Sequence, residues 1–211
     1  VPDKMEHIFF KYQGTGNDFV IFDNRQGDIT LSREQVAFLC HRRFGIGADG
    51  LMLLNSHPDY DFEMKYYNAD GGESTMCGNG GRCLVKFAAD CGIIRNDYRF
   101  LAIDGEHLAS IENNGNVALK MNDVATVQEE NGHFILNTGS PHYVNLVENV
   151  MELDVVNKGR EVRYSDAFAK EGINVNFVEM HRNGEGIIVR TYERGVEDET
   201  FSCGTGVTAA A

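Results

Sequence analysis

Glu73-Ser-Thr-Met-Cys77-Gly-Asn-Gly80 is the stretch that determines the architecture, because the chain repeats its pattern as Glu199-Thr-Phe-Ser-Cys203-Gly-Thr-Gly206. Both copies consist of a glutamate, three residues, a cysteine and Gly-x-Gly, and more than half of the chain separates the two cysteines. A repeat at this distance indicates two related halves, each with one thiol at an equivalent place. We therefore expect two similar α/β domains, over residues 1–122 and 123–211, each with a central helix wrapped by mixed and antiparallel strands.

The pattern Cys-Gly-x-Gly at the start of a helix places a thiol beside backbone N–H groups that have no partner within the helix. The helix dipole is positive at this end, so the position binds anions and favours the thiolate over the thiol. One such thiol indicates a nucleophile, whereas two that face one substrate indicate a proton removed on one side and returned on the other. The N–H groups near Gly78, Asn79, Gly204 and Thr205 are then expected to hold a carboxylate, and this chemistry needs no cofactor.

The composition narrows the class of protein. The 211-residue chain is 42% hydrophobic and 24% charged, which is typical of a globular protein. Its net charge of −13 argues against nucleic acid or an anionic membrane as a partner, and no apolar run is long enough to span a bilayer. The five cysteines are irregularly spaced and indicate neither a secreted disulfide framework nor a zinc site, so we expect no metal and a reducing, cytoplasmic location.

Hydrophobic periodicity and turn residues predict most elements of the chain. Strands are expected at residues 7–12, 19–23, 50–55, 61–68, 100–103, 107–112, 117–121, 134–137, 143–147, 173–180 and 187–192. Helices are expected at 32–44 and 78–89, with weaker indications at 151–160 and from 207 onwards. Ser32 and Gln35 form a capping-box pattern at the first helix. Cys40, Cys83 and Cys91 lie in or just after these helices and are interpreted as packing residues.

The second half is expected to be incomplete. Within the first half 45 residues follow Cys77, whereas only 8 residues follow Cys203. If the two halves match, the natural chain continues beyond Ala211 by about 37 residues. Those residues would supply the counterparts of the strands predicted between 100 and 121.

Further motifs join the repeat in giving the sequence a resemblance to a known family. They are Lys11-Tyr-Gln-Gly-Thr-Gly-Asn-Asp-Phe19, Tyr67-Asn-Ala-Asp-Gly71, Cys77-Gly-Asn-Gly80 with Arg82, Tyr192-Glu-Arg-Gly195 and Cys203-Gly-Thr-Gly206. In combination they resemble the diaminopimelate epimerases, from about His7 to the last residue. That family is similar to proline racemase in fold and in its use of two cysteines.

The resemblance implies a cofactor-independent isomerase that interconverts LL- and meso-diaminopimelate, a small-molecule substrate, in lysine and peptidoglycan synthesis. It implies that Cys77 and Cys203 are the catalytic acid/base pair, with His142 and Glu193 tuning the two thiols. The residues that it assigns to substrate binding are Asn17, Asn68, Gly78, Asn79, Asn174, Glu193, Arg194, Gly204 and Thr205. It leaves a homodimer open.

The same residues also have plainer interpretations. Asn17 and Asn68 are of a type that favours turns, and His142 is a single histidine with no motif of its own. Glu193 and Arg194 are neighbours that would contribute little as an exposed ion pair. Two positions depart from the family: Ser140 stands where the family often has Asn, and Gly50 stands where it often has Gln.

Two alternative functions stay open at this point. One is a racemase of the proline or hydroxyproline type, although Arg194 and the asparagines favour a substrate with a second polar end, which proline lacks. The other is a non-catalytic relative that binds an amino acid or senses redox state through Cys77 and Cys203. Exchange of substrate α-protons with solvent separates an enzyme from a binding protein.

Overall fold

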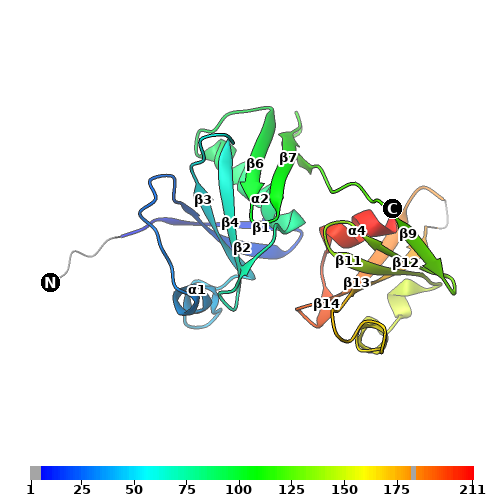
Figure 1. The fold of residues 1–211 in the computed structure, drawn as a ribbon. Coiled ribbons are helices and arrows are strands. Elements are labelled where there is room, and N and C mark those ends of the chain that lie inside the picture. Colours follow the sequence, from blue (N-terminus) through cyan, green and yellow to red (C-terminus); the bar gives the residue numbers. More distant parts are fainter. Residues whose placement is uncertain (1–5, 182–183) are drawn as a thin grey trace. The chain divides into compact units, whose positions relative to one another are not determined.

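The computed structural model describes residues 6–181 and 184–211, which form a mixed α/β fold. The chain divides into two compact units, the first ending at Lys120 and the second beginning at Met121 (Figure 1). Each unit contains one sheet and its own helices. The predicted α/β class is therefore confirmed.

The first unit is built on an eight-stranded sheet with the spatial order β1-β2-β3-β4-β6-β7-β8, in which β5 pairs with β4. The strands are β1 (Phe9–Gly14), β2 (Asn17–Asp23), β3 (Gly50–Asn55), β4 (Phe62–Asn68), β5 (Glu73–Ser74), β6 (Asp97–Ala102), β7 (Gly105–Ile111) and β8 (Val117–Leu119). β2 runs parallel to β3, as β4 does to β6. Parallel neighbours need a crossover, which helices α1 (Arg33–Cys40) and α2 (Gly78–Asp90) supply.

Helix α2 is the centre of this unit. Leu84, Phe87 and Ala88 are at most 1% exposed and belong to one core with side chains of β2, β3, β4 and β6. The helix contacts β1, β2, β3, β4, β7 and β8, so that the sheet curls around it (Figure 1). Full burial of a large apolar side chain contributes about 1.5–3 kcal/mol, so the inner face of α2 holds the unit together.

The second unit has a six-stranded sheet in the order β14-β13-β12-β11-β10-β9. The strands are β9 (Val127–Glu130), β10 (His133–Asn137), β11 (Pro141–Leu146), β12 (Asn174–Met180), β13 (Ile187–Glu193) and β14 (Asp198–Thr200). A 3-10 turn η1 (Val150–Glu152) and helix α3 (Val155–Arg163) form the crossover between the parallel pair β11 and β12, and α4 (Gly204–Ala210) follows β14. The core of the unit lies between the sheet and α3, where Val155, Val175 and Tyr192 are at most 1% exposed.

The two units repeat one order of elements. In the first unit β1, β2, α1, β3, β4, β5 and α2 follow one another, and in the second unit β10, β11, α3, β12, β13, β14 and α4 do so. Corresponding pairs have the same direction, with β2–β3 and β11–β12 parallel and the others antiparallel. The register also agrees, because Tyr67 pairs with Glu73 as Tyr192 pairs with Glu199. Each repeated motif therefore begins at the same place in its unit.

Helix α1 has the predicted start but not the predicted end. Ser32 is its N-cap residue and forms the complete capping box with Gln35. The helix ends at Cys40, not at Phe44, because His41 is extended and the chain then folds back, with Ile46 and Ala48 donating to the carbonyls of Leu39 and Cys40. Gly45 is needed in this loop because any side chain there would overlap the carbonyl of Phe38.

Strands β9 and β14 and the exact start of α3 in the second unit were not predicted. Strand β9 is fully exposed and rich in glutamate and glutamine, so it has no apolar alternation to indicate a strand. The helix expected at 151–160 is η1 followed by α3, since Asp154 caps the later start by accepting a hydrogen bond from the Asn157 N–H at 3.1 Å. An aspartate at this position is a typical N-cap residue, so Asp154 marks the start of α3 in the sequence as well.

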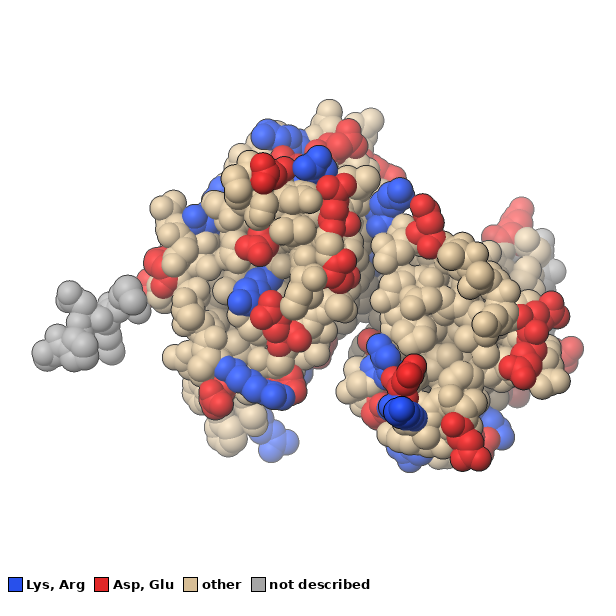
Figure 2. Space-filling model, in the orientation of Figure 1, with Lys and Arg blue, Asp and Glu red and all other residues tan. Residues whose placement is uncertain are grey.

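The surface carries charges of both signs. Figure 2 shows acidic side chains interspersed with basic ones over the visible face of each unit. Among the described residues, none of the helices is long and apolar enough to cross a membrane.

Replacing Gly50 by alanine is expected to destabilise the first unit. A Cβ at Gly50 would lie 2.6 Å from a ring carbon of Tyr66 and 2.8 Å from the Tyr67 carbonyl oxygen, so β3 and β4 must shift. Overpacking of this kind costs about 1–3 kcal/mol. Gly186→Ala is the control, because a Cβ there meets no described atom within 4 Å. Urea denaturation compares the two, and equal free energies of unfolding would contradict the packing at Gly50.

Candidate active site

Each cysteine of the repeated motif is the N-cap residue of a helix. Cys77 precedes α2 and Cys203 precedes α4, with extended backbone angles (φ −94° and −118°). The carbonyl of each cysteine accepts the first helical hydrogen bond, from Gly81 N at 2.7 Å and from Val207 N at 2.9 Å. The N–H groups that follow each cysteine belong to the first turn, which has no acceptors within its own helix and where the dipole is positive. Both thiols therefore lie at helix N-termini.

In the first unit, the candidate residues come from neighbouring strand ends. Asn17 is the first residue of β2, and Asn68 is the last residue of β4 and pairs with Gly50 at the start of β3. Because β2 and β3 are parallel, their first residues lie at the same end of the sheet. Asn79 in the first turn of α2 packs against Gly14, the partner of Asn17 in the β1–β2 pair. The structure thus gathers Asn17, Asn68 and Asn79 at one end of this sheet.

Asn17 and Asn79 differ in how their amide oxygens are satisfied. The Oδ1 atom of Asn79 accepts a hydrogen bond from Arg82 at 2.5 Å. The Oδ1 atom of Asn17 is buried and has no hydrogen-bond partner among the described residues. A buried acceptor without a donor is destabilising, so Asn17 is suited to accept a hydrogen bond from a ligand.

Asp104, which was not among the predicted site residues, binds the backbone of the residue before Cys77. Its Oδ1 atom accepts from the Met76 N–H at 3.1 Å and lies 3.3 Å from the Nε2 atom of the buried His107. Burial alone raises the pKa of Asp104, but the hydrogen bonds from His107 and Met76 outweigh it and hold that pKa below its ordinary value. The sequence signal at Asp104 is only that of a hairpin turn, since Gly105 follows it.

In the second unit, the candidate side chains again come from strand ends. His142 on β11 pairs with Asn174, the first residue of β12, and both are at most 4% exposed. The amide of Asn174 donates to Ser140 Oγ at 2.8 Å and accepts from the Arg194 N–H at 2.9 Å. Glu193 is the last residue of β13 and directly precedes Arg194. Ser140 therefore contacts a candidate binding residue even though its side chain is shorter than asparagine.

Cys203 has a polar neighbour in its own helix turn. The Sγ atom lies 3.4 Å from Thr205 Oγ1, and the thiol-bearing residue is 8% exposed. The carbonyl of Thr205 accepts a hydrogen bond from Thr138 Oγ1 at 2.8 Å, which ties the first turn of α4 to the loop between β10 and β11. This loop therefore positions the helix end that carries Cys203.

The candidate residues of the two units occupy equivalent positions in the strand registers. When Tyr67 is aligned with Tyr192, the strand registers match Asn68 with Glu193, Gly50 with Asn174, and Phe19 with His142. The duplication has thus placed different chemistry at the same three places. At these places the second unit has a carboxylate, an amide and an imidazole, where the first has an amide, a glycine and a phenyl ring.

Burial makes His142 a weak base. The side chain is 0% exposed. This burial, together with the positive charge of Arg194, lowers the pKa of His142 to about 4. The imidazole is therefore neutral at pH 7.

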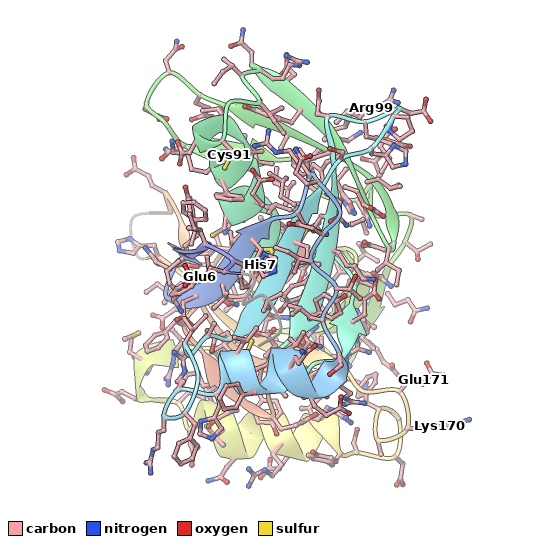
Figure 3. All side chains as sticks on the ribbon, turned by 90° about the vertical axis from the view of Figure 1, so that its left-hand side faces the viewer. Glu6, His7, Cys91, Arg99, Lys170 and Glu171 are labelled. Carbon is pink, nitrogen blue, oxygen red and sulfur yellow. The ribbon has the colours of Figure 1, made fainter. Side chains whose placement is uncertain are left out.

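The other three cysteines have a different environment. Burial raises the pKa of Cys40 and of Cys83 to about 11, so both are protonated packing residues, as predicted. Burial also raises the pKa of the half-buried Cys91, which lies at the C-terminal end of α2 (Figure 3). Burial therefore disfavours the thiolate at these three positions.

Comparisons with known proteins cover both units. The sequence profile of the family described as diaminopimelate epimerase matches residues 9–127 and 134–211. The diaminopimelate epimerase of Flavobacterium psychrophilum is 52% identical over 203 residues, covering 96% of this chain and 79% of that protein. The diaminopimelate epimerase of Chlorobaculum tepidum is 46% identical over 206 residues, covering 94% of this chain and 79% of that protein.

The fold is also found in a more distant protein. The crystal structure of a Bacillus anthracis phenazine biosynthesis protein of the PhzF family has a TM-score of 0.70 with this chain at 15% sequence identity. The match covers 97% of this chain and 79% of that one. At this identity the likeness concerns the fold alone.

The burial of His142 predicts that acid weakens the second unit. Because its pKa is lowered to about 4 when folded, the unfolded chain takes up the proton first as the pH falls below about 6.5. The stabilisation is complete above that pH and is lost between about 6.5 and 4, by at most about 3 kcal/mol. Denaturation at pH 7.5 and pH 5 should show a larger loss for the wild type than for His142→Gln. Equal losses in both proteins would contradict the prediction.

Proposed function

The chain belongs to the diaminopimelate epimerase family, and from that premise we propose that it interconverts LL- and meso-diaminopimelate with Cys77 and Cys203 as its acid and base. Membership of the family makes the chain an isomerase with a small-molecule substrate. The two-thiol mechanism and the roles of the individual residues are the content of the proposal.

One observation supports the two-thiol mechanism above all others. Cys77 and Cys203 are the N-cap residues of corresponding helices in two units with the same element order and the same strand register. Inversion at a carbon needs a base on one face and an acid on the other. A duplicated unit provides two equivalent thiols for these tasks, whereas a hydrolase or a group-transfer enzyme would need only one nucleophile.

The proposed reaction moves one proton at a time. The substrate carboxylate accepts hydrogen bonds from first-turn N–H groups near Gly78, Asn79, Gly204 and Thr205, which stabilise the charge that develops as the α C–H bond breaks. One thiolate takes that proton and forms S–H, while the electron pair stays on the substrate. The other thiol gives its proton to the opposite face of the same carbon. At the end the two sulfurs have exchanged protonation states, and no atom has been gained or lost.

The remaining candidate residues have supporting roles in this proposal. His142 and Glu193 tune the thiols, and Asn17, Asn68, Asn174 and Arg194 hold the substrate. Asn17 is supported by its buried amide oxygen without a partner among the described residues. Arg194 is exposed, and its guanidinium donates one hydrogen bond to the carbonyl of Glu171 at 3.1 Å. A guanidinium has five donors, so such a contact leaves several for the distal carboxylate of the substrate.

Membership of the family also supports a proposal for the pathway, the cofactor requirement and the location of the enzyme. We propose a role in lysine and peptidoglycan synthesis and no cofactor, because two thiols supply both the acid and the base. The five cysteines form no disulfide in the described part of the chain, which favours a cytoplasmic location. A substrate with two amino-acid ends, in place of proline, is favoured by Arg194 and by the likeness to diaminopimelate epimerases in both units.

Cys77→Ala and Cys203→Ala are each expected to abolish epimerisation in both directions. Either change removes the only proposed acid or base on one face of the substrate α-carbon. A positioned acid or base contributes about 10²–10⁴-fold to the rate. Cys40→Ala is the matched control, since Cys40 is a buried packing residue. Solvent-deuterium incorporation at the substrate α-carbon measures both steps. Near wild-type turnover in either single mutant would rule out the two-thiol mechanism, and exchange in none of the proteins would indicate a binding protein.

Arg194→Lys is expected to raise the KM for diaminopimelate, because a lysine ammonium cannot form two parallel hydrogen bonds with a carboxylate. Arg190→Lys is the control for a structural arginine. The Arg190 guanidinium donates two hydrogen bonds to the Glu199 carboxylate, of 2.6 and 2.7 Å. Replacing Arg190 should therefore lower the stability of the protein and leave KM unchanged. Steady-state kinetics that showed no change for Arg194→Lys would remove this residue from the binding site.

A further inference from the structure

We propose that Asn176 is a positioning residue for His142, and that its buried amide holds the imidazole as the tautomer with the proton on Nε2. The inference rests on the proposed function, in which His142 tunes the catalytic thiols. It adds a residue that neither the repeated motif nor the family motifs contain. Asn176 lies in the middle of β12 and is 0% exposed.

The contacts of Asn176 fix the orientation of its amide. Its Nδ2 atom lies 3.1 Å from the backbone carbonyl of Tyr143, which can only accept a hydrogen bond. Its Oδ1 atom accepts a hydrogen bond from Thr191 Oγ1 at 2.9 Å. The amide cannot be reversed without placing two acceptors against each other at Tyr143. The group at this position is therefore the NH2, which has two protons to donate.

The second proton of this NH2 determines the tautomer of His142. The Nδ1 atom of His142 lies 3.0 Å from Asn176 Nδ2. Since the amide nitrogen can only donate, Nδ1 must accept and carries no proton. A neutral imidazole has its single proton on the other nitrogen. His142 therefore presents Nε2–H as a donor, at the atom that is buried and has no hydrogen-bond partner among the described residues.

The network lies next to the catalytic helix end. A Cβ added at Gly206 would overlap Asn176 Oδ1 and lie 3.3 Å from Cys203 Sγ. Asn176 and the Cys203 thiol therefore flank the same glycine, the last residue of the repeated motif. A hydrogen bond from an Nε2–H donor to a thiolate stabilises the charged form, and Cys203 is the motif cysteine of this unit.

The first unit shows that the fold does not require this polar network. By strand register, the counterparts of His142, Asn176 and Thr191 are Phe19, Met52 and Tyr66. Those three side chains belong to one apolar core, with the rings of Phe19 and Tyr66 6.0 Å apart. Three apolar side chains therefore satisfy the packing of the fold at these positions. Three linked polar side chains at the same sites of the second unit indicate a chemical role.

The groups that face His142 from the surrounding elements are few. Leu136 of β10 and Asn174 of β12 pair with it, Asn176 bonds to its Nδ1 atom, and helix α4 contacts β11. Arg194, at the end of β13, is the positive charge that acts on the imidazole. The titration of His142 and of Cys203 is therefore expected to respond to Asn176 more than to other neutral residues of the unit.

The first measurement is made on the unaltered protein. Nitrogen-15 spectra of the labelled chain at pH 7 distinguish a protonated from an unprotonated ring nitrogen. We expect His142 to show an unprotonated Nδ1 and a protonated Nε2. The reverse pattern would overturn the proposal, and the measurement does not depend on catalytic activity.

The second measurement uses Asn176→Asp, which has nearly the same shape but turns the NH2 into an acceptor. It should move the proton of His142 to Nδ1, shift the pH profile of Cys203 alkylation and lower kcat at least about tenfold with little change in KM. The alkylation profile of Cys77 in the same sample is the internal reference. Thr191→Val, which removes only the hydroxyl that orients the amide, should produce a smaller shift in the same direction.

Asn24→Asp is the control for placing a carboxylate at a buried amide. Asn24 is 8% exposed and bonds to Asn55 and Ile29, so the change should reduce stability without altering the His142 tautomer or the Cys203 profile. A wild-type tautomer and an unchanged Cys203 profile in Asn176→Asp would overturn the proposal. If the unaltered chain has no epimerase activity but the tautomer moves as expected, the proposed function fails and the role of Asn176 stands.

Discussion

The close approach of each cysteine-capped helix to its sheet is the constraint on which the structure depends. Glycine at the fourth position of the motif Cys-Gly-x-Gly makes this approach feasible. A Cβ at Gly206 would overlap Asn176, and one at Gly80 would lie 3.3 Å from Met52 Sδ. At Gly206 a side chain would force Asn176 or the helix to move, and at Gly80 it would crowd the core side chains beneath the helix. The glycines of the motif therefore serve the packing of the helix as much as the binding of an anion.

The sequence predicted the elements whose signals are local. The capping box of Ser32, the apolar face of α2 and the alternation of β4 were all readable from periodicity and side-chain type. The end of α1 was not, because it is decided by the loop that returns over the carbonyls of Leu39 and Cys40. Strand β9 was not, because an exposed strand at a sheet edge needs no apolar residues.

The residues of the candidate site also fall into those with a local sequence signal and those without one. The two cysteines follow from a repeated motif, and the binding residues from a resemblance to a family. Asp104 and Asn176 belong to neither, because their importance comes from partners that are distant in sequence. Asn176 meets His142 only through the register of two parallel strands separated by the crossover α3. Such a contact is fixed by the tertiary fold and leaves no periodic signal in either strand.

The crossover between β11 and β12 has a consequence for the order of events during folding. Parallel pairing of residues 142 and 174 requires a long loop to close before any ladder hydrogen bond repays its entropy, so this step is slow. Helix α4 contacts β11, β12 and β13, so it gains this packing only after these strands have paired. The special environment of Cys203 therefore forms only late, and a partly folded chain carries an ordinary thiol at this position. Reactivity at Cys203 is in this sense a reporter of completed folding.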